Sequence, residues 1–196
     1  MKTNKVCLMV ALAGAVTIWA GGAQAASKVF DTFGPKYTSN PGSYYCDFGA
    51  GNGACGNGTT MLTHAFKFTP GVSGALSYID LALFNFTGTQ GATVTIVTDN
   101  AGAPGRAPAL ETIYVPKLTT CAPCSATKKQ KIASKLHPAL TAGTPYWLIV
   151  YPSAYDTGNF IQQSPSATGP EASSVDGGNH WDVLTSPLAA FDVFVQ

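Results

Sequence analysis

Hydrophobic and polar residues alternate along several short stretches of the chain. Between Ala75 and Phe84, the apolar residues Ile79, Leu81 and Leu83 fall on one side, and mostly polar or small residues fall on the other. A period of two is typical of a half-buried β-strand, because successive side chains of a strand point to opposite faces. The stretch from Thr93 to Thr98 repeats the pattern and predicts a second strand of the same kind.

The segment from Tyr146 to Tyr151 is instead apolar on both faces, which predicts a central strand covered by a second sheet on one side and by loops on the other. Shorter strands, separated by Gly, Pro, Asn and Asp, are expected at Lys28 to Phe33, His64 to Thr69, Leu110 to Val115, Gln130 to Leu136, Asn159 to Gln163, His180 to Val183 and Ala190 to Val195. Many short strands with turns between them predict an all-β fold, an antiparallel β-sandwich of jelly-roll type.

The composition narrows the class of protein. Of 196 residues only 11% are charged, while 21 are Gly and 13 are Pro. A nucleic-acid binder, a coiled coil or a disordered charged tail needs denser charge, so these classes are excluded. We expect no cofactor and no nucleic-acid partner.

The first 25 residues have the pattern of a secretory signal peptide. Lys2 and Lys5 precede an apolar run from Val6 to Ala20, and Ala23-Gln24-Ala25 fits a cleavage site. Removing this segment changes the formal net charge from +1 to −1. We expect residues 26–196 to form a single β-sandwich domain that is secreted, either extracellular or periplasmic, with no membrane span.

Four cysteines remain in the mature chain, Cys46, Cys55, Cys121 and Cys124. An even number in an exported protein favours two disulfides, and we expect local pairing within a Gly-rich loop from Cys46 to Cys55 and within Cys121-Ala122-Pro123-Cys124. The second pair could instead be a redox Cys-x-x-Cys, although the expected helix is missing. A zinc site of all four thiolates is the last alternative, because the first spacing is too long for a usual zinc knuckle.

The order of several segments resembles the choice-of-anchor R domain of exported bacterial proteins, which often carry a PEP-CTERM-type sorting tail. These segments are His64 to Pro70, Gly74 to Leu83, Thr98 to Gly105, His137 to Leu148 and Asp176 to Trp181. The resemblance implies a surface or extracellular β-sandwich, with no catalytic residues to carry over. The chain departs from the pattern in showing no sorting tail and in carrying two cysteine pairs.

Catalytic chemistry has little support in the sequence. The mature chain has His64, His137 and His180, but neither a Gly-x-Ser-x-Gly elbow nor a His-Glu-x-x-His motif. His64 begins a predicted strand and His137 precedes a proline, so both are expected to be structural. We expect a non-catalytic protein with no catalytic residue.

Ligand binding is the more plausible activity, because exposed rings can stack on sugars while amides and carboxylates meet the hydroxyl groups. The candidate binding residues are Tyr155, Asn159, Asp176, Asn179, His180 and Trp181. The alternative is that most of these rings cover the core. Oxygen ligands for calcium are available at Asp99 and Asn100, or at Asp156 and Asp176, but these are also ordinary turn residues, and we expect no metal.

Five lysines cluster around the Cys-x-x-Cys loop: Lys117, Lys128, Lys129, Lys131 and Lys135. Such a patch could meet an acidic polysaccharide or a phosphate-rich envelope, or it could protect a strand edge from aggregation. The sequence therefore predicts a secreted β-sandwich that binds or assembles at the cell envelope or in the extracellular matrix, with polysaccharide or another envelope protein as partner. The alternatives are a carbohydrate-binding module and, more distantly, an envelope thiol-disulfide redox protein. The oligomeric state is left open.

Overall fold

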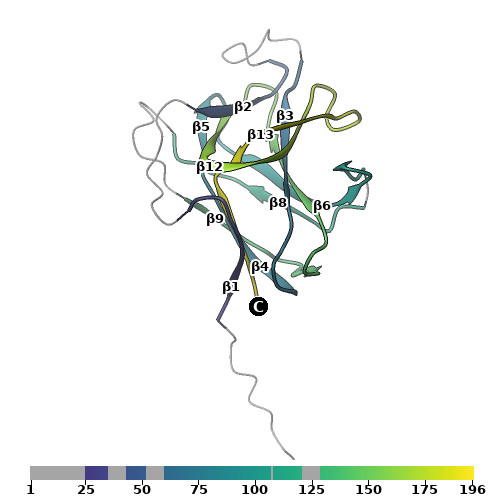
Figure 1. Ribbon diagram of the computed structural model, residues 1–196. Helices are drawn as coiled ribbons and strands as arrows, with labels where there is room; N and C mark the ends of the chain where they lie inside the picture. The colour runs from purple at the N-terminus through teal and green to yellow at the C-terminus, as the bar shows by residue number, and fades with distance from the viewer. Residues whose placement is uncertain (1–24, 35–42, 52–59, 107, 121–128) are drawn as a thin grey trace, which may run out of the picture.

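Two antiparallel β-sheets face each other in the computed structural model, which describes residues 25–34, 43–51, 60–106, 108–120 and 129–196 (Figure 1). The described residues form strands and no helix. The five-stranded sheet contains β1 (Ser27–Asp31), β14 (Phe191–Val195), β4 (Gly74–Leu81), β10 (Ala139–Leu140) and β9 (Gln130–Ala133).

The nine-stranded sheet follows the path β13 (Asp182–Ala189), β12 (Gly158–Ser174), β3 (Thr63–Phe68), β11 (Tyr146–Pro152), β6 (Ala92–Asn100) and β7 (Ala103–Pro104). Beside this path, β2 (Tyr44–Phe48) and β5 (Leu83–Thr87) pair with β12, and β8 (Glu111–Val115) pairs with β6.

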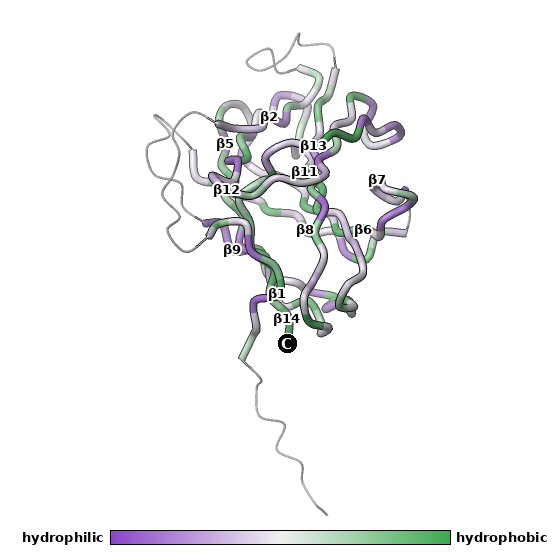
Figure 2. Tube along the Cα trace, viewed as in Figure 1, coloured by the Kyte–Doolittle hydropathy of each residue, from purple (hydrophilic) through white to green (hydrophobic). Residues whose placement is uncertain are grey.

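The main core lies between the two sheets. Leu76, Ile79 and Phe191 from the five-stranded sheet are fully buried and share one hydrophobic cluster with Phe66 and Leu148 from the nine-stranded sheet. Along the strands in Figure 2, hydrophobic (green) residues interchange with hydrophilic (purple) or intermediate (white) ones, in keeping with a period of two. The predicted antiparallel β-sandwich is thereby confirmed, whereas the strand order does not by itself establish the predicted jelly-roll connectivity.

Strand β11 confirms the prediction of a strand covered on both faces. Leu148 and Val150 belong to the main core. Trp147 and Ile149 point to the opposite face, into a second hydrophobic cluster on which Tyr151 and Trp181 pack. The loop that carries Trp181 therefore covers the outer face of the nine-stranded sheet.

Several strands differ from the sequence expectations; β13, for instance, runs over Asp182–Ala189, where the sequence predicted a strand only at His180 to Val183. Strand β12 is 17 residues long, whereas the sequence predicted a strand only at Asn159 to Gln163. Its first part pairs with β2 and β5 and its second part with β3 and β13, and its pairing with β13 shifts register between Gln163 and Thr168. The residues beyond Gln163 are rich in Ser, Pro and Gly, which usually mark a loop, but pairing with β13 from Thr168 and with β3 from Glu171 keeps the later part extended.

Cys46 was expected to start a Gly-rich loop, but it lies inside β2, which pairs with β12 through Phe160. The alternation of this region was hidden by the glycines that follow it. Cys55, Cys121 and Cys124 lie outside the described residues, so the expected pairing, the redox alternative and the zinc alternative all stay predictions.

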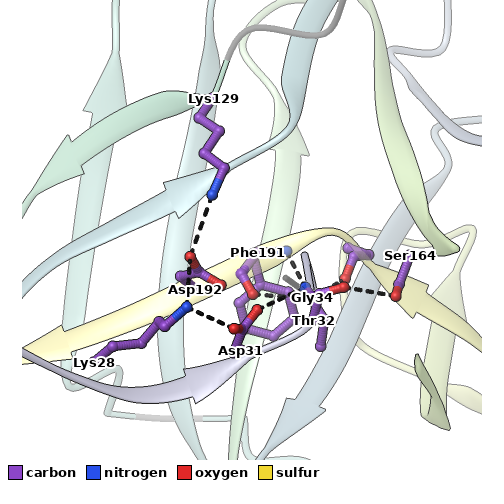
Figure 3. A network of polar contacts seen from close by, with 9 residues as sticks. Lys28, Asp31, Thr32, Gly34, Lys129, Ser164, Phe191 and Asp192 are labelled. Atoms are coloured by element: carbon purple, nitrogen blue, oxygen red, sulfur yellow. Dashed lines mark hydrogen bonds and ion pairs between the residues drawn. The ribbon is translucent and has the colours of Figure 1, made fainter. Parts of the chain in front are cut away.

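A polar network fastens the N-terminal strand to the C-terminal one, which lies beside it (Figure 3). Lys28 Nζ lies 2.5 Å from Asp31 Oδ2 and 3.7 Å from Asp192 Oδ2, and Lys129 Nζ lies 3.4 Å from the same Asp192 oxygen. Burial, together with the neighbouring Asp31, raises the pKa of Asp192 to about 6. Thr32 extends the network, because its Oγ1 accepts the Phe191 N–H at 2.7 Å.

Most of the predicted signal peptide, residues 1–24, lies outside the described residues. Within the described ranges, no helix has the length and apolar character needed to cross a membrane.

Candidate functional site

An open groove lies between the β6–β7 hairpin and the loop that connects β12 to β13. We call it the Trp181 groove; its volume is about 400 Å³. Its lining residues come from both of these segments: Asn100, Ala103, Pro104, Arg106, Asn179, His180, Trp181 and Asp182.

The β6–β7 hairpin forms one wall through a tight turn. Ala101 and Gly102 both have positive φ, 52° and 93°, which is the pattern of a type I′ turn. The Gly102 N–H donates to Asp99 Oδ2 at 3.0 Å. This turn places Asn100 and Ala103 opposite each other at the groove.

Asp99 braces that wall against the sheet. Its Oδ1 accepts the Trp147 Nε1–H at 2.8 Å and lies 2.9 Å from Lys67 Nζ. Although partial burial favours the neutral acid, the hydrogen bonds from Lys67, Trp147 and the Gly102 amide hold the pKa of Asp99 below its usual value. The carboxylate that the sequence offered for calcium is therefore already paired with a lysine.

The β12–β13 loop forms the other wall and is ordered around Asp176. The Asp176 Oδ1 accepts the Asn179 N–H at 3.0 Å, the His180 N–H at 2.9 Å and the Ser174 hydroxyl at 2.9 Å, while Oδ2 pairs with His180 Nδ1. The hydrogen bond from His180 is the largest cause of a strongly lowered pKa for Asp176. The His180 side chain itself stays 85% exposed.

Trp181 lies between this loop and the sheet. Its ring packs on the second hydrophobic cluster beside Tyr151, yet it still lines the groove. Gly178, with φ of 89°, makes room for it, since a Cβ there would come within 2.9 Å of Tyr151 Oη and 3.2 Å of Trp181 Cζ2. Arg106 Nη2 donates to the Asn179 carbonyl and so connects the two walls.

The groove therefore offers an aromatic surface surrounded by polar groups. Arg106 supplies a cation, Asp182 a carboxylate, and Asn100 and Asn179 supply amides, which both donate and accept hydrogen bonds. Such a set suits a polar ligand with hydroxyl groups and at least one apolar face. Among the described residues, no group of three or more His, Cys, Asp or Glu side chains is arranged to hold a metal ion.

The structure brings four of the predicted binding residues together, and two lie elsewhere. Asp176, Asn179, His180 and Trp181 belong to one loop, as the sequence order suggested. Tyr155 is 69% exposed but lies next to Gly51, whose amide donates to the Tyr155 carbonyl at 2.8 Å.

The second displaced residue, Asn159, is fully buried in β12, where its amide donates to the Gly91 carbonyl at 3.0 Å. Sequence reasoning missed Arg106 as a groove residue. The dense turn formers from Asp99 to Gly105 were the only signal of a nearby hairpin, and nothing in them indicated which loop that hairpin meets.

A second polar cluster lies inside the sandwich, around His64. Its Nδ1 pairs with Asp47 Oδ1, and its Nε2 lies 3.9 Å from Glu171 Oε1. Asp47 is 0% exposed, His64 7% and Glu171 4%, so a ligand has little of them to touch. Burial raises the pKa of Asp47 to about 6 and also raises that of Glu171; the two carboxylates raise the pKa of His64 against its own burial.

His137 is held in a different way. Its Nδ1 lies 2.8 Å from the Leu76 carbonyl, and its backbone has a positive φ of 49°. Both His64 and His137 therefore have defined contacts within the fold, in keeping with the structural roles that the sequence suggested.

No protein-family model matches this chain, and no curated protein matches it either.

Proposed function

We propose that this protein is an exported, non-catalytic β-sandwich that acts by binding at the cell envelope or in the extracellular matrix, and that the Trp181 groove is its binding site. The main observation behind the proposal is that the β6–β7 hairpin and the β12–β13 loop, each held by internal hydrogen bonds, meet around the partly exposed ring of Trp181. Asp176 orders one loop and Asp99 the other, and the Arg106 contact to Asn179 connects them. Pre-ordered walls reduce the entropy lost on binding.

Export rests on the signal-peptide pattern of residues 1–25 and on the resemblance to choice-of-anchor R domains. Two disulfides among Cys46, Cys55, Cys121 and Cys124 fit the same oxidising compartment. Mass mapping of the secreted protein tests both points. A mature N-terminus at Ala26 and four oxidised cysteines are expected, whereas a readily reduced Cys121–Cys124 pair favours the redox alternative.

The binding experiment compares the mature protein with three variants in co-sedimentation with isolated envelope and matrix material. Arg106→Ala and His180→Ala remove exposed groove side chains without opening the core, and both are expected to weaken binding. Tyr155→Ala is the matched control, because this tyrosine is exposed but lies outside the groove. Equal binding by all the proteins rejects the groove as the site.

A carbohydrate-binding module is the second candidate function. The observation favouring it is the Trp181 ring with Asn100, Asn179 and Asp182 around it, since a pyranose presents an apolar face and a rim of hydroxyls. A glycan array with the mature protein separates the two functions. The carbohydrate module is favoured if the protein binds a glycan on the array, if free oligosaccharide competes with this binding, and if His180→Ala abolishes it. If no glycan binds, the partner at the envelope is not a carbohydrate.

A further inference from the structure

A second groove lies far from Trp181 in the sequence, where the two sheets approach each other at their edges. Its volume is about 310 Å³, and β8 of the nine-stranded sheet and β9 of the five-stranded sheet contribute to its walls. We call it the β8–β9 groove; it is lined by Ile113, Tyr114, Val115, Pro116, Gln130, Lys131, Ile132, Ala133 and Lys135. Among the described residues, β8 pairs only with β6 and β9 only with β4.

The floor of this groove is the edge of the main core. Ile113, Val115 and Ile132 belong to the core cluster and are 5%, 7% and 2% exposed. On β8, Ile113 and Val115 alternate with exposed residues, among them Tyr114, which is 55% exposed. An added strand would meet the same alternation, with every second side chain on the apolar floor.

Positive charge lies along the rim. Lys131 and Lys135 line the groove, and no acidic residue is among the lining residues. Lys131 Nζ also lies 3.7 Å from the centre of the Tyr78 ring, which holds this side chain on the outer face of β4 and β9. Lys117, one residue beyond Pro116, is exposed and adds a further cation near the end of β8. The charge complement of this rim is an acidic ligand.

We propose that the β8–β9 groove binds an extended acidic segment of a partner polypeptide, which adds a strand to the edge of β8. The strand edge offers main-chain hydrogen bonds, the floor takes apolar side chains at alternate positions, and the two lysines meet the carboxylates between them. A polypeptide fits better than an acidic polysaccharide, because a polysaccharide has neither a continuous amide main chain to pair with β8 nor apolar side chains for the floor. This surface is separate from the Trp181 groove, so neither site depends on the other.

The test uses a ten-residue peptide in which valine and glutamate alternate, with a valine–lysine peptide of the same length and polygalacturonate as comparisons. Binding is followed by fluorescence anisotropy, and the contact is located by hydrogen–deuterium exchange of the backbone amides. The acidic peptide is expected to bind and to slow exchange in residues 111–115. The double variant Lys131→Glu and Lys135→Glu is expected to weaken that binding by roughly tenfold or more.

Tyr114→Ala removes an exposed ring at the groove and is expected to weaken binding severalfold, while Tyr155→Ala, an exposed tyrosine outside the groove, should leave it unchanged. Melting curves confirm that each variant is folded. The proposal is overturned if the two peptides bind alike, or if the acidic peptide gives no protection of β8. If polygalacturonate binds without protecting β8 from exchange, and the peptides do not bind, then the lysines form a surface for polysaccharide instead. If exchange in β8 slows only when the protein associates with itself, and not when the acidic peptide is added, then the edge of β8 binds a second copy of this chain.

Discussion

Glu111 Oε2 accepts the hydroxyl of Ser134 at 2.6 Å and thereby joins the edges of the two sheets. Glu111 begins β8, and Ser134 directly follows β9. The other carboxylate oxygen accepts the Lys135 N–H at 2.5 Å and the Leu136 N–H at 3.0 Å. Although burial opposes ionisation, these hydrogen bonds lower the pKa of Glu111. One side chain therefore holds the two walls of the β8–β9 groove together.

Replacing Glu111 with Gln should destabilise the protein without changing its fold. The variant keeps the size of the side chain but loses the charge that strengthens three hydrogen bonds, so we expect the free energy of unfolding to fall by about 1–3 kcal/mol. Urea denaturation at neutral pH measures this. Ser134→Ala removes one contact only and should cost less; a larger loss for Ser134→Ala than for Glu111→Gln contradicts this account.

Stability should fall as the pH rises from about 4 to 7. The pKa values of His64, Glu171, Asp47 and Asp192 are all raised, the last two to about 6. The folded state then binds more protons than the unfolded chain in this window, and the free energy of unfolding decreases with pH. Below about pH 4 the free energy of unfolding should instead fall as the pH falls, because Asp31, whose pKa is lowered to about 2, loses its stabilising charge.

Urea titrations at intervals between pH 3 and 8 measure this profile. Asp47→Asn removes one of the four groups and should flatten the decline above pH 4. Asp182→Asn, at an exposed position at the start of β13, is the control and should leave the slope unchanged. A stability that rises steadily from pH 4 to 7 is incompatible with the proton uptake described for these groups.

Alanine substitutions at Gly178 and Gly102 distinguish the cost of side-chain crowding from the cost of backbone strain. Both have a positive φ, 89° and 93°, but a Cβ at Gly178 meets Tyr151 Oη at 2.9 Å, while at Gly102 it meets nothing within 4 Å. Gly102→Ala should therefore cost about 1–2 kcal/mol from strain alone. Gly178→Ala should cost more and shift the fluorescence of Trp181. Equal losses of unfolding free energy in the two variants would show that Tyr151 moves aside freely.

Asp176→Ala should loosen the β12–β13 loop while leaving the sandwich intact. The Asp176 carboxylate accepts the Asn179 and His180 amides, so its removal leaves both without that acceptor. Hydrogen–deuterium exchange should become faster for residues 175–181 and stay unchanged in β11. Unaltered exchange in the loop would mean that Ser174 and Gly178 order it without Asp176.

Local pattern predicted most of the strands. Alternation located β4 and β6, and the doubly apolar run located β11, because the period of two is a property of the backbone and of how each face is solvated. The turn residues before it marked the start of β8. Alternation missed the later part of β12, where prolines and glycines suppress the pattern and pairing with β3 and β13 keeps the chain extended.

In the candidate site, too, local features could be predicted from the sequence and long-range contacts could not. Asp176 to Trp181 could be predicted as a group, since these residues are neighbours in one loop whose hydrogen bonds are local. The contact from Arg106 to Asn179 joins residues 73 positions apart and follows only from strand pairing.

Likewise, the lysines around the Cys-x-x-Cys loop are one cluster in the sequence, but the described ones do not all lie together in the fold. Lys129 lies over the Phe33 ring at 3.8 Å, whereas Lys131 and Lys135 line the β8–β9 groove. The sequence by itself determined the all-β class and the order of most strands, because alternation and turn residues act over a few positions. Which edges and loops face one another was decided only by the tertiary structure, since packing two sheets on one core sets distances between residues that are remote in the chain.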